Sequence, residues 1–290
     1  MNIPEVEAFF DNDSHTISYV VSDPETRHAA IIDSVLGFDY ASGALSYQLA
    51  DDILAYIAEQ DFIIDWLIET HVHADHLSAA PYLQQKIGGK IAISKHIVEV
   101  QKIFGKVFNA GTAFERDGRQ FDRLLEDQDS YEVGSLQGRA IHTPGHTPAC
   151  MAHIIGDAIF VGDTLFMPDG GTARADFPGG DARTLYQSIH KILAQPDEMR
   201  IFVCHDYMPG GRDLGYMTTV GAQRADNIHI GGGISEDEFV KMRETRDATL
   251  SMPKLILPSI QVNMRGGNMP PAEDNEEIYL KVPISGIRGK

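Results

Sequence analysis

Thr70-His71-Val72-His73-Ala74-Asp75-His76 is the stretch that decides the fold. It holds three imidazoles and a carboxylate, and it directly follows an apolar run at residues 62–68 that predicts a buried strand. Side chains alternate along extended backbone, so His71 and His73 are expected to point the same way. Imidazole and carboxylate are ligand types for zinc and iron. The stretch therefore predicts a metal site at the end of a strand, with a helix beginning at Leu77.

Three further loops, each after a strand-like run, carry the same types of side chain. His146 lies at the tip of a loop that two prolines and a glycine constrain, at residues 143–148. Asp163 follows the run at 158–162, and His205 follows the run at 200–204. A single histidine is more often structural than a ligand. Four such loops in one chain indicate one composite site.

Composition limits the function classes. The 290 residues carry a formal net charge of -18, with a pI near 4.9. Nucleic-acid binding requires a basic surface, so this balance argues against DNA, RNA and anionic membranes as partners. The two cysteines, Cys150 and Cys204, are too few for a disulfide framework, and we expect both to be buried. With no apolar run of membrane-spanning length and no export signal visible, we expect a cytoplasmic protein.

The order of predicted elements suggests a duplicated half. A β-meander at 8–35 is followed by a helix at 46–60, a strand at 62–69, a helix at 77–88 and a strand at 90–94. Short strands return at 136–141, 150–155 and 158–162, followed by a helix at 181–193 with Asp181 as its N-cap and a strand at 200–204. Such an order favours two mixed sheets packed face to face, with helices outside.

The remaining segments are less regular. Residues 95–130 are polar after a helical beginning, and we expect a surface insertion, an oligomer contact or part of a pocket wall. Helices are expected at 216–227 and 235–249. The proposed division is one domain at 1–250 with the insertion at 95–130, and a tail at 251–290 that packs on the surface of the same domain.

The pattern His71-x-His73-x-Asp75-His76, followed by His146, Asp163 and His205, resembles the ligand set of the metallo-β-lactamase superfamily. The resemblance covers roughly residues 8–210. It implies an α/β fold, a four-layer αββα sandwich of two mixed sheets, with the site at one edge between the sheets. A fold hosts many chemistries, so this resemblance leaves the reaction open.

In the dinuclear zinc hydrolases of that superfamily, the resemblance assigns two metals. His71, His73 and His146 would hold one. Asp75, His76 and His205 would hold the other, with Asp163 bridging. A bound water would then attack a carbonyl or phosphoryl group.

In the persulfide dioxygenases, the resemblance assigns one Fe(II) per chain to His71, His146 and Asp163. Two histidines and one carboxylate leave open positions for oxygen and a sulfur ligand. The other four residues would orient ligands and water from outside the metal's coordination shell. These four are His73, Asp75, His76 and His205.

The residues after Asp163 resemble the dioxygenase branch, in particular the bacterial β-lactamase-like sulfur dioxygenases. Arg174-x-Asp176-Phe177 matches a motif of that branch, as do residues 204–207 and 262–267, and the segment 117–122 is similar to part of its insertion. This resemblance implies oxidation of glutathione persulfide by oxygen to sulfite and glutathione. The chain departs from the mitochondrial members in residues 95–130, and we expect no fused rhodanese domain.

Substrate contacts follow from the chemistry of glutathione persulfide, whose two carboxylates favour bidentate cations. Arg174 is the first candidate, with Asp176 orienting it, and Tyr207 could donate a hydrogen bond near His205. Arg265 is a further candidate, and Arg212 and Arg224 are looser ones. The expected partners are a small thiol persulfide and oxygen, with a homodimer or higher homo-oligomer as the assembly.

The alternative is a dinuclear zinc hydrolase of a glutathione thioester, similar to glyoxalase II. The helices at 216–249 and the tail are small compared with the helical domain that binds glutathione in that family. A β-lactamase is disfavoured because that activity usually accompanies export. A non-catalytic sensor would be expected to lose ligands, and all seven are present.

Overall fold

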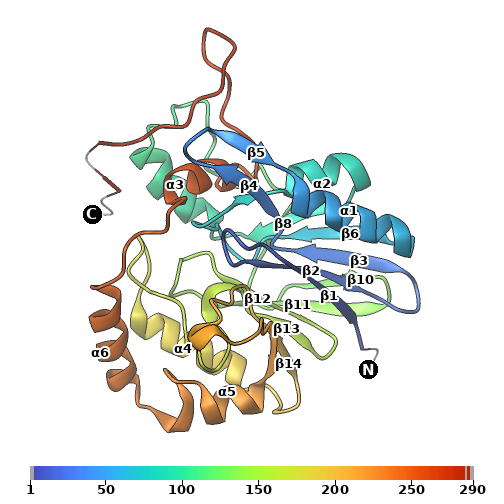
Figure 1. Cartoon of the computed structure of the whole chain (residues 1–290), viewed down its shortest axis with the longest axis vertical. Coiled ribbons are helices and arrows are strands. Elements are labelled where there is room, and N and C mark those ends of the chain that lie inside the picture. The colour runs from blue at the N-terminus through green and yellow to red at the C-terminus, as the bar shows by residue number, and fades with distance from the viewer. Residues whose placement is uncertain (1–2, 285, 288–290) are drawn as a thin grey trace.

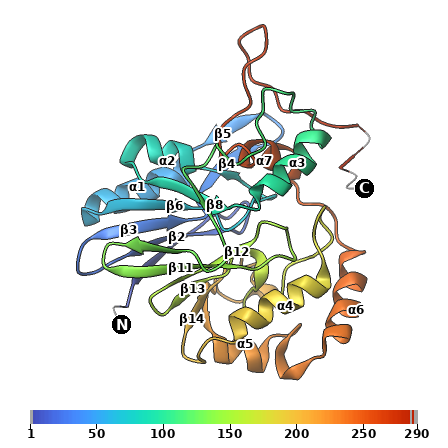
Figure 2. The ribbon, with the colours of Figure 1, turned by 180° about the vertical axis from the view of Figure 1, so that it is seen from behind.

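Two mixed β-sheets face each other, and helices cover their outer faces (Figures 1 and 2). The computed structural model describes residues 3–284 and 286–287. The predicted αββα sandwich is confirmed. Among the described residues, no helix is long and apolar enough to cross a membrane.

The first sheet has the strand order β1-β2-β3-β6-β8-β9. β1 to β3 pair antiparallel, and the β3, β6, β8 and β9 pairings are parallel. Its strands are β1 (Glu5–Phe10), β2 (Ile17–Ser22), β3 (His28–Ile32), β6 (Ile63–Ile68), β8 (Lys90–Ser94) and β9 (Arg123–Leu125).

The second sheet has the order β10-β11-β12-β13-β14-β15. All its pairings are antiparallel except the parallel pair β13 and β14. Its strands are β10 (Ser130–Val133), β11 (Leu136–His142), β12 (Met151–Ile155), β13 (Ala158–Phe160), β14 (Arg200–Phe202) and β15 (Met217–Thr219). A small third sheet joins β5 (Ala44–Ser46), β4 (Val35–Asp39) and β7 (Leu77–Ser78).

Seven α-helices complete the described chain. They are α1 (Gln48–Gln60), α2 (Ala80–Ile87), α3 (Ile97–Val107), α4 (Ala182–Leu193), α5 (Val220–Asp226), α6 (Glu236–Asp247) and α7 (Ile256–Asn263). Short 3-10 turns occur at Gly162–Thr164, Pro209–Gly211 and Gly231–Gly233. The predicted N-cap of α4 is confirmed, because the Asp181 carboxylate accepts from the Thr184 backbone N–H.

The two halves repeat one connection. In the first half, the β1–β3 meander leads through α1 to β6, which pairs parallel with β3. In the second half, the β11–β13 meander leads through α4 to β14, which pairs parallel with β13. Parallel neighbours end at the same edge of a sheet. The repeat therefore brings the loops after β3 and β6 close together, and likewise those after β13 and β14.

Strand β2 shows why the sheets stack. Ile17, Tyr19 and Val21 point toward the second sheet, whereas Val20 packs in the separate core under the helices. The period of two gives each face its own apolar layer. Tyr19 also crosses the gap and donates its hydroxyl to the Val203 carbonyl oxygen at 2.5 Å.

Two boundary predictions were wrong. Leu77 begins strand β7 instead of a helix, and α2 begins at Ala80 with Pro81 in its first turn, where a proline lacks only an N–H that has no helical partner. The predicted helix at 216–227 is split. Its first part is β15, and α5 begins after Thr219, whose hydroxyl accepts from the Ala222 N–H.

Residues 95–130 and the tail contribute to the hydrophobic core as well as to the surface. Phe104, Phe114 and Phe121 are buried in the core under the first sheet, and β9 extends that sheet. Helix α7 lies within the tail and is buried along most of its length in the same core. Bulky apolar side chains among polar neighbours explain why this stretch, which composition suggested was polar surface, is partly interior.

Candidate metal centre

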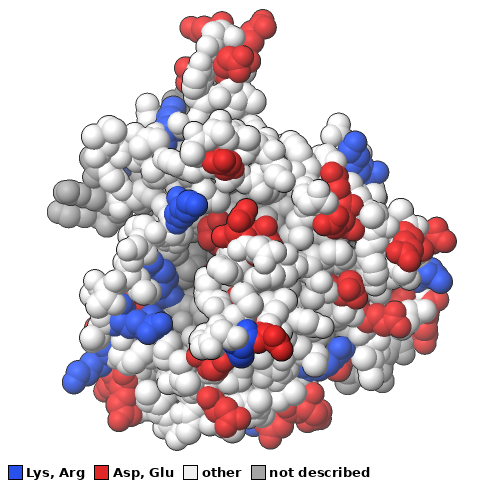
Figure 3. Space-filling model, viewed as in Figure 1, with Lys and Arg blue, Asp and Glu red and all other residues white. Residues whose placement is uncertain are grey.

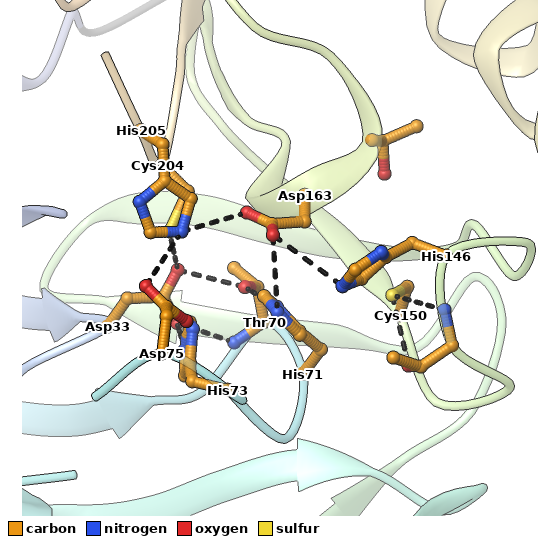
Figure 4. Close-up of polar contacts among 12 residues, drawn as sticks. Asp33, Thr70, His71, His73, Asp75, His146, Cys150, Asp163, Cys204 and His205 are labelled. Carbon is orange, nitrogen blue, oxygen red and sulfur yellow. Dashed lines mark hydrogen bonds and ion pairs between the residues drawn. The ribbon is translucent and has the colours of Figure 1, made fainter. Parts of the chain in front are cut away.

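The candidate site lies where five strands end. Asp33 follows β3, residues 70–76 follow β6, and His146 lies in the loop after β11. Asp163 and His205 follow β13 and β14. All of these loops meet at one edge between the sheets, and Figure 4 shows their side chains converging. The structure thus brings together all seven residues that the sequence singled out as donors.

Asp163 is the centre of the cluster. Its Oδ2 lies 3.8 Å from His71 Nε2 and 3.5 Å from His146 Nε2. Its Oδ1 faces the other way, 3.2 Å from His205 Nε2, which is also 3.3 Å from Asp75 Oδ2. One carboxylate therefore faces two separate groups of donors.

Three of the histidine rings are each held by a hydrogen bond at Nδ1, the nitrogen that does not face the cluster. The Nδ1 of His76, His146 and His205 lies 2.9, 2.8 and 3.2 Å from the carbonyl oxygens of Leu77, Arg174 and His15. A carbonyl can only accept, so Nδ1 carries a proton in all three rings and Nε2 is the nitrogen that faces the site. This is how metal-binding histidines are usually oriented.

His73 is oriented in the opposite sense. Its Nε2 lies 3.0 Å from Asp33 Oδ1 and 3.4 Å from Glu69 Oε2, and all three side chains are buried. Glu69 in turn accepts from the Ser78 hydroxyl at 2.6 Å, and Asp33 accepts from the Thr70 N–H at 2.8 Å. Burial opposes a charged ring, but Asp33 raises the pKa of His73 well above its usual value. The Nδ1 of His73 is left facing the site.

Burial keeps two other histidine rings in the neutral form that binds metal. It lowers the pKa of His71 well below the usual range, and the neighbouring His73 adds to the effect. Burial and His73 also lower the pKa of His76 to about 4. Both rings are neutral near pH 7, the form that binds metal. Burial alone would raise the pKa of Asp163, but the surrounding imidazoles, led by His205, hold it well below its ordinary value.

The donor atoms fit a metal ion. Buried polar atoms without a hydrogen-bond partner include His71 Nε2, His73 Nδ1, His76 Nε2, Asp163 Oδ1 and His205 Nε2. Such orphaned atoms are costly unless something binds them. Among the described residues, four groups of three have donor atoms within 4.8 Å of one another. Two of these groups are built only from predicted donors: His71 with His146 and Asp163, and His73 with Asp75 and His76.

Both cysteines are buried and free, as predicted. Strand alternation would point Cys204 away from His205 and the site, but the structure turns its side chain toward the site. Its Sγ lies within 4.8 Å of donor atoms of Asp163 and His205, and 3.6 Å from Asp33 Oδ2. The backbone turns directly after β14, so strand alternation does not apply there. Cys150 instead contacts Thr147 beyond His146 (Figure 4).

A cavity of about 1210 Å³ opens onto the cluster and is lined by Asp75, His146 and Asp163. Arg174 and Tyr207 line it as well. Arg174 forms a bidentate pair with Asp176, at 2.6 and 2.8 Å, as the sequence suggested. The Tyr207 ring stacks on His205, with centroids 5.9 Å apart.

The other three candidate arginines do not line the cavity. Arg265 packs over the Phe114 ring. Arg212 is bound by Asp169 and Asp206, and Arg224 by Asp197 and two backbone carbonyls at the end of α4 and just beyond it. Arg212 and Arg224 are satisfied by these partners, whereas Arg265 Nε is buried without a hydrogen-bond partner. A sequence motif alone does not reveal either arrangement.

Sequence reasoning missed three supporting residues. Asp33 and Thr16 contact donor histidines and Asp75, and Asn263 contacts the loop at 70–76. Asp33 carried a usable signal, because it follows a buried strand in the same way as the other site residues. Asn263 lies within residues 262–267, which resemble the dioxygenase branch, but that resemblance did not indicate its contact with the loop. Thr16 lies far from the motifs in sequence and carried no signal.

Comparison with known proteins identifies the family. The family model described as the metallo-beta-lactamase superfamily matches residues 12–205, which contain all seven donors. The chain is a member of the metallo-β-lactamase superfamily.

Within this superfamily, similar proteins carry different names. A protein of Burkholderia pseudomallei named a probable metallo-hydrolase is 54% identical, over 97% of this chain and 99% of its own length. Human persulfide dioxygenase ETHE1 is 30% identical, over 90% of this chain and 88% of its own. The crystal structure of ETHE1 from Myxococcus xanthus superposes with a TM-score of 0.72 at 28% identity, covering 91% of this chain and 100% of that one.

Proposed function

We propose that the protein is an iron(II)-dependent persulfide dioxygenase that converts glutathione persulfide and oxygen to sulfite and glutathione. The observation that carries the proposal is the group formed by His71, His146 and Asp163. Two imidazole nitrogens lie 3.8 and 3.5 Å from the same carboxylate oxygen, Asp163 Oδ2. Two histidines and one carboxylate on one side of a metal are typical of non-haem iron oxygenases.

The position of this group supports the proposal. His146 and Asp163 line the cavity, so a metal between them would face it. Ferrous iron held there would supply open positions at which oxygen and a sulfur ligand meet. The protein's part is to hold the three donors: the Arg174 carbonyl fixes the His146 ring at 2.8 Å, and Thr70 fixes the His71 ring at 3.0 Å.

The cavity also suits a zwitterionic peptide. Lys and Arg gather on one side of a hollow in the molecular face, and acidic residues lie on another side (Figure 3). Within the described chain, Arg246 and Lys254 line the cavity and form no ion pair. Asp13 and Asp39 line it too, and Lys254 contributes to lowering the pKa of Asp39, after the backbone N–H groups of Ala41 and Ser42.

We assign the carboxylates of glutathione to Arg246 and Lys254, and its ammonium to the aspartates. Arg174 borders the same space, although Asp176 and the Ser251 carbonyl already accept most of its N–H groups. Tyr207 faces the cavity beside His205 and is the proposed hydrogen-bond donor near the reacting end.

The test is the metal content together with oxygen uptake. Purified protein loaded with ferrous iron should bind one iron per chain and consume one oxygen for each sulfite released from glutathione persulfide. Two zinc ions per chain with no oxygen uptake would overturn the proposal.

A second candidate is a dinuclear zinc hydrolase of a glutathione thioester. It is favoured by the two oxygens of Asp163, because Oδ2 faces His146 and Oδ1 faces His205. The orphaned nitrogens of His73 and His76 favour it as well. The 54% identical relative is also named a metallo-hydrolase. Release of thiol from a glutathione thioester by the zinc-loaded protein is the measurement that separates the two candidates.

A further inference from the structure

The end of helix α7 contacts the metal-binding loop from behind. Asn263 is the last residue of α7, and its side chain is buried at 5% exposure. Its Nδ2 donates to the carbonyl oxygens of His73 at 2.9 Å and His76 at 2.8 Å. Its Oδ1 accepts from the Ser78 N–H at 2.8 Å. One side chain thus binds three backbone groups of a loop nearly 190 residues earlier in the chain.

These contacts require a primary amide. Only Asn and Gln combine two N–H donors and an acceptor in one planar group. The two carbonyls belong to His73 and His76, which lie three positions apart in the loop, and Asp75 lies between them. Fixing both ends fixes the direction in which the intervening side chains point.

The support behind Asn263 is rigid. Gln101 of α3 donates its Nε2 to the Met264 carbonyl at 2.9 Å and accepts from the Gly118 N–H at 3.0 Å. Met264 is fully buried. Helix α7 is therefore tied to residues 95–130, which gives that segment a role in supporting the site.

We propose that Asn263 is a positioning residue that holds the loop between His73 and His76 in its metal-binding conformation. The donor atoms His73 Nδ1 and His76 Nε2 are buried without a partner, so their usefulness depends on direction. Metal sites tolerate displacements of only about 0.5 Å. The proposal rests on the site binding a divalent metal. It holds for either candidate function, because the rings of His73 and His76 would bind metal in the hydrolase and would orient ligands beside the iron in the dioxygenase.

The same helix offers a matched control. The Gln261 side chain is also buried, at 3% exposure, and its amide also makes three hydrogen bonds to backbone. It donates to the carbonyls of Leu257 and Lys281 and accepts from the Lys281 N–H. Gln261 fastens the tail instead of the metal loop.

The experiment compares Asn263→Asp with Gln261→Glu, which make the same change of amide to carboxylate. Metal-free protein is titrated with cobalt(II) against a chromophoric chelator. Asn263→Asp loses both donors and places a negative charge against two carbonyl oxygens. We expect its cobalt dissociation constant to rise about tenfold or more, as when supports of metal ligands are removed. Gln261→Glu should bind cobalt as the wild type does.

Two further readouts separate positioning from general destabilisation. The visible spectrum of bound cobalt should change in Asn263→Asp and match the wild type in Gln261→Glu. In the metal-free protein, hydrogen exchange at the Ser78 amide should accelerate in Asn263→Ser, which is shorter and uncharged. Asn263→Ser also carries the affinity test if the aspartate variant does not fold.

Wild-type cobalt affinity in the Asn263 variants, or an equal loss in Gln261→Glu, would overturn the proposal. Failure of oxygen uptake with the cobalt results intact would refute the dioxygenase and leave the role of Asn263 standing.

Discussion

The two groups of donors are built in different ways. His71, His146 and Asp163 come from three loops that belong to both halves of the molecule. His73, Asp75 and His76 come from one loop of the first half. Packing of the two sheets is enough to assemble the first group, whereas the second depends on how a single loop is supported. The difference suggests that the fold determines the first group and that distant side chains, Asp33 and Asn263 among them, tune the second.

Removing a donor of the first group should have the largest effect. His146→Ala leaves Asp163 and His71 without the third donor of their group. We expect iron affinity to fall by more than about 100-fold, beyond the usual cost of losing a supporting residue, and oxygen uptake to disappear. Metal analysis and oxygen-electrode assays measure both.

His142→Gln is the control for that variant, because His142 lies near His146 in sequence but stacks on His96 outside the cluster. Equal iron content in wild type and His146→Ala would contradict the assignment of the first group.

A donor of the second group should matter less for iron. In His76→Gln we expect one iron per chain to be retained, with activity reduced about 10–100-fold, as for residues that support metal ligands. Iron stoichiometry and kcat report the two quantities. Loss of half the metal from a zinc-loaded protein would instead show that the second group is a metal site in its own right, as the hydrolase requires.

The positive charges that are proposed to bind the substrate lie outside both groups of metal donors. In the double variant Arg246→Glu and Lys254→Glu, KM for glutathione persulfide should rise about tenfold or more while kcat changes little, because charge-assisted bonds contribute about 1.5–3 kcal/mol. Lys241→Glu, an exposed site on the same helix α6, makes the same reversal of charge away from the cavity lining. A matching rise in KM in that control would show a field effect instead of contacts.

The smallest expected effect is on the pH dependence of stability, and it concerns a buried histidine that belongs to neither group of metal donors. His153 lies in β12, where burial lowers its pKa to about 4 and the Tyr131 hydroxyl contacts its Nδ1 at 3.0 Å. The unfolded chain gains a proton as pH falls below about 6.5, but the folded ring stays neutral until about pH 4. This contribution to stability is therefore complete above pH 6.5 and is lost as the pH falls toward 4.

Between pH 6.5 and 5 the loss from His153 should be roughly 2 kcal/mol. Urea unfolding at both values should show a smaller pH-dependent loss in His153→Leu than in the wild type. An identical slope would mean that His153 titrates normally. Burial would then not be what keeps this ring neutral.

The sequence predicted most of the site because its signals are local. Each donor follows an apolar run, and a strand end places a side chain with little dependence on the rest of the chain. Asp33 obeys the same rule, but a single carboxylate carries no spacing pattern that would single it out.

What the sequence could not predict depends on contacts over long separations. Asn263 reaches His73 across 190 positions, and no periodicity encodes that contact. Cys204 turned inward because the backbone leaves the strand geometry after β14. Residues 95–130 read as surface on composition, yet Phe114 and Phe121 are buried among charged neighbours.

The long separation between Asn263 and the loop that it fixes also bears on biosynthesis. The loop at 70–76 leaves the ribosome well before the amide that fixes it, which is made 190 positions after His73. Domains begin to fold during synthesis from the N-terminal side. A nascent chain can thus form its first sheet long before its metal loop is held in place. Tight metal uptake would then be a late event that follows completion of α7, which limits capture of the wrong ion by an unfinished chain.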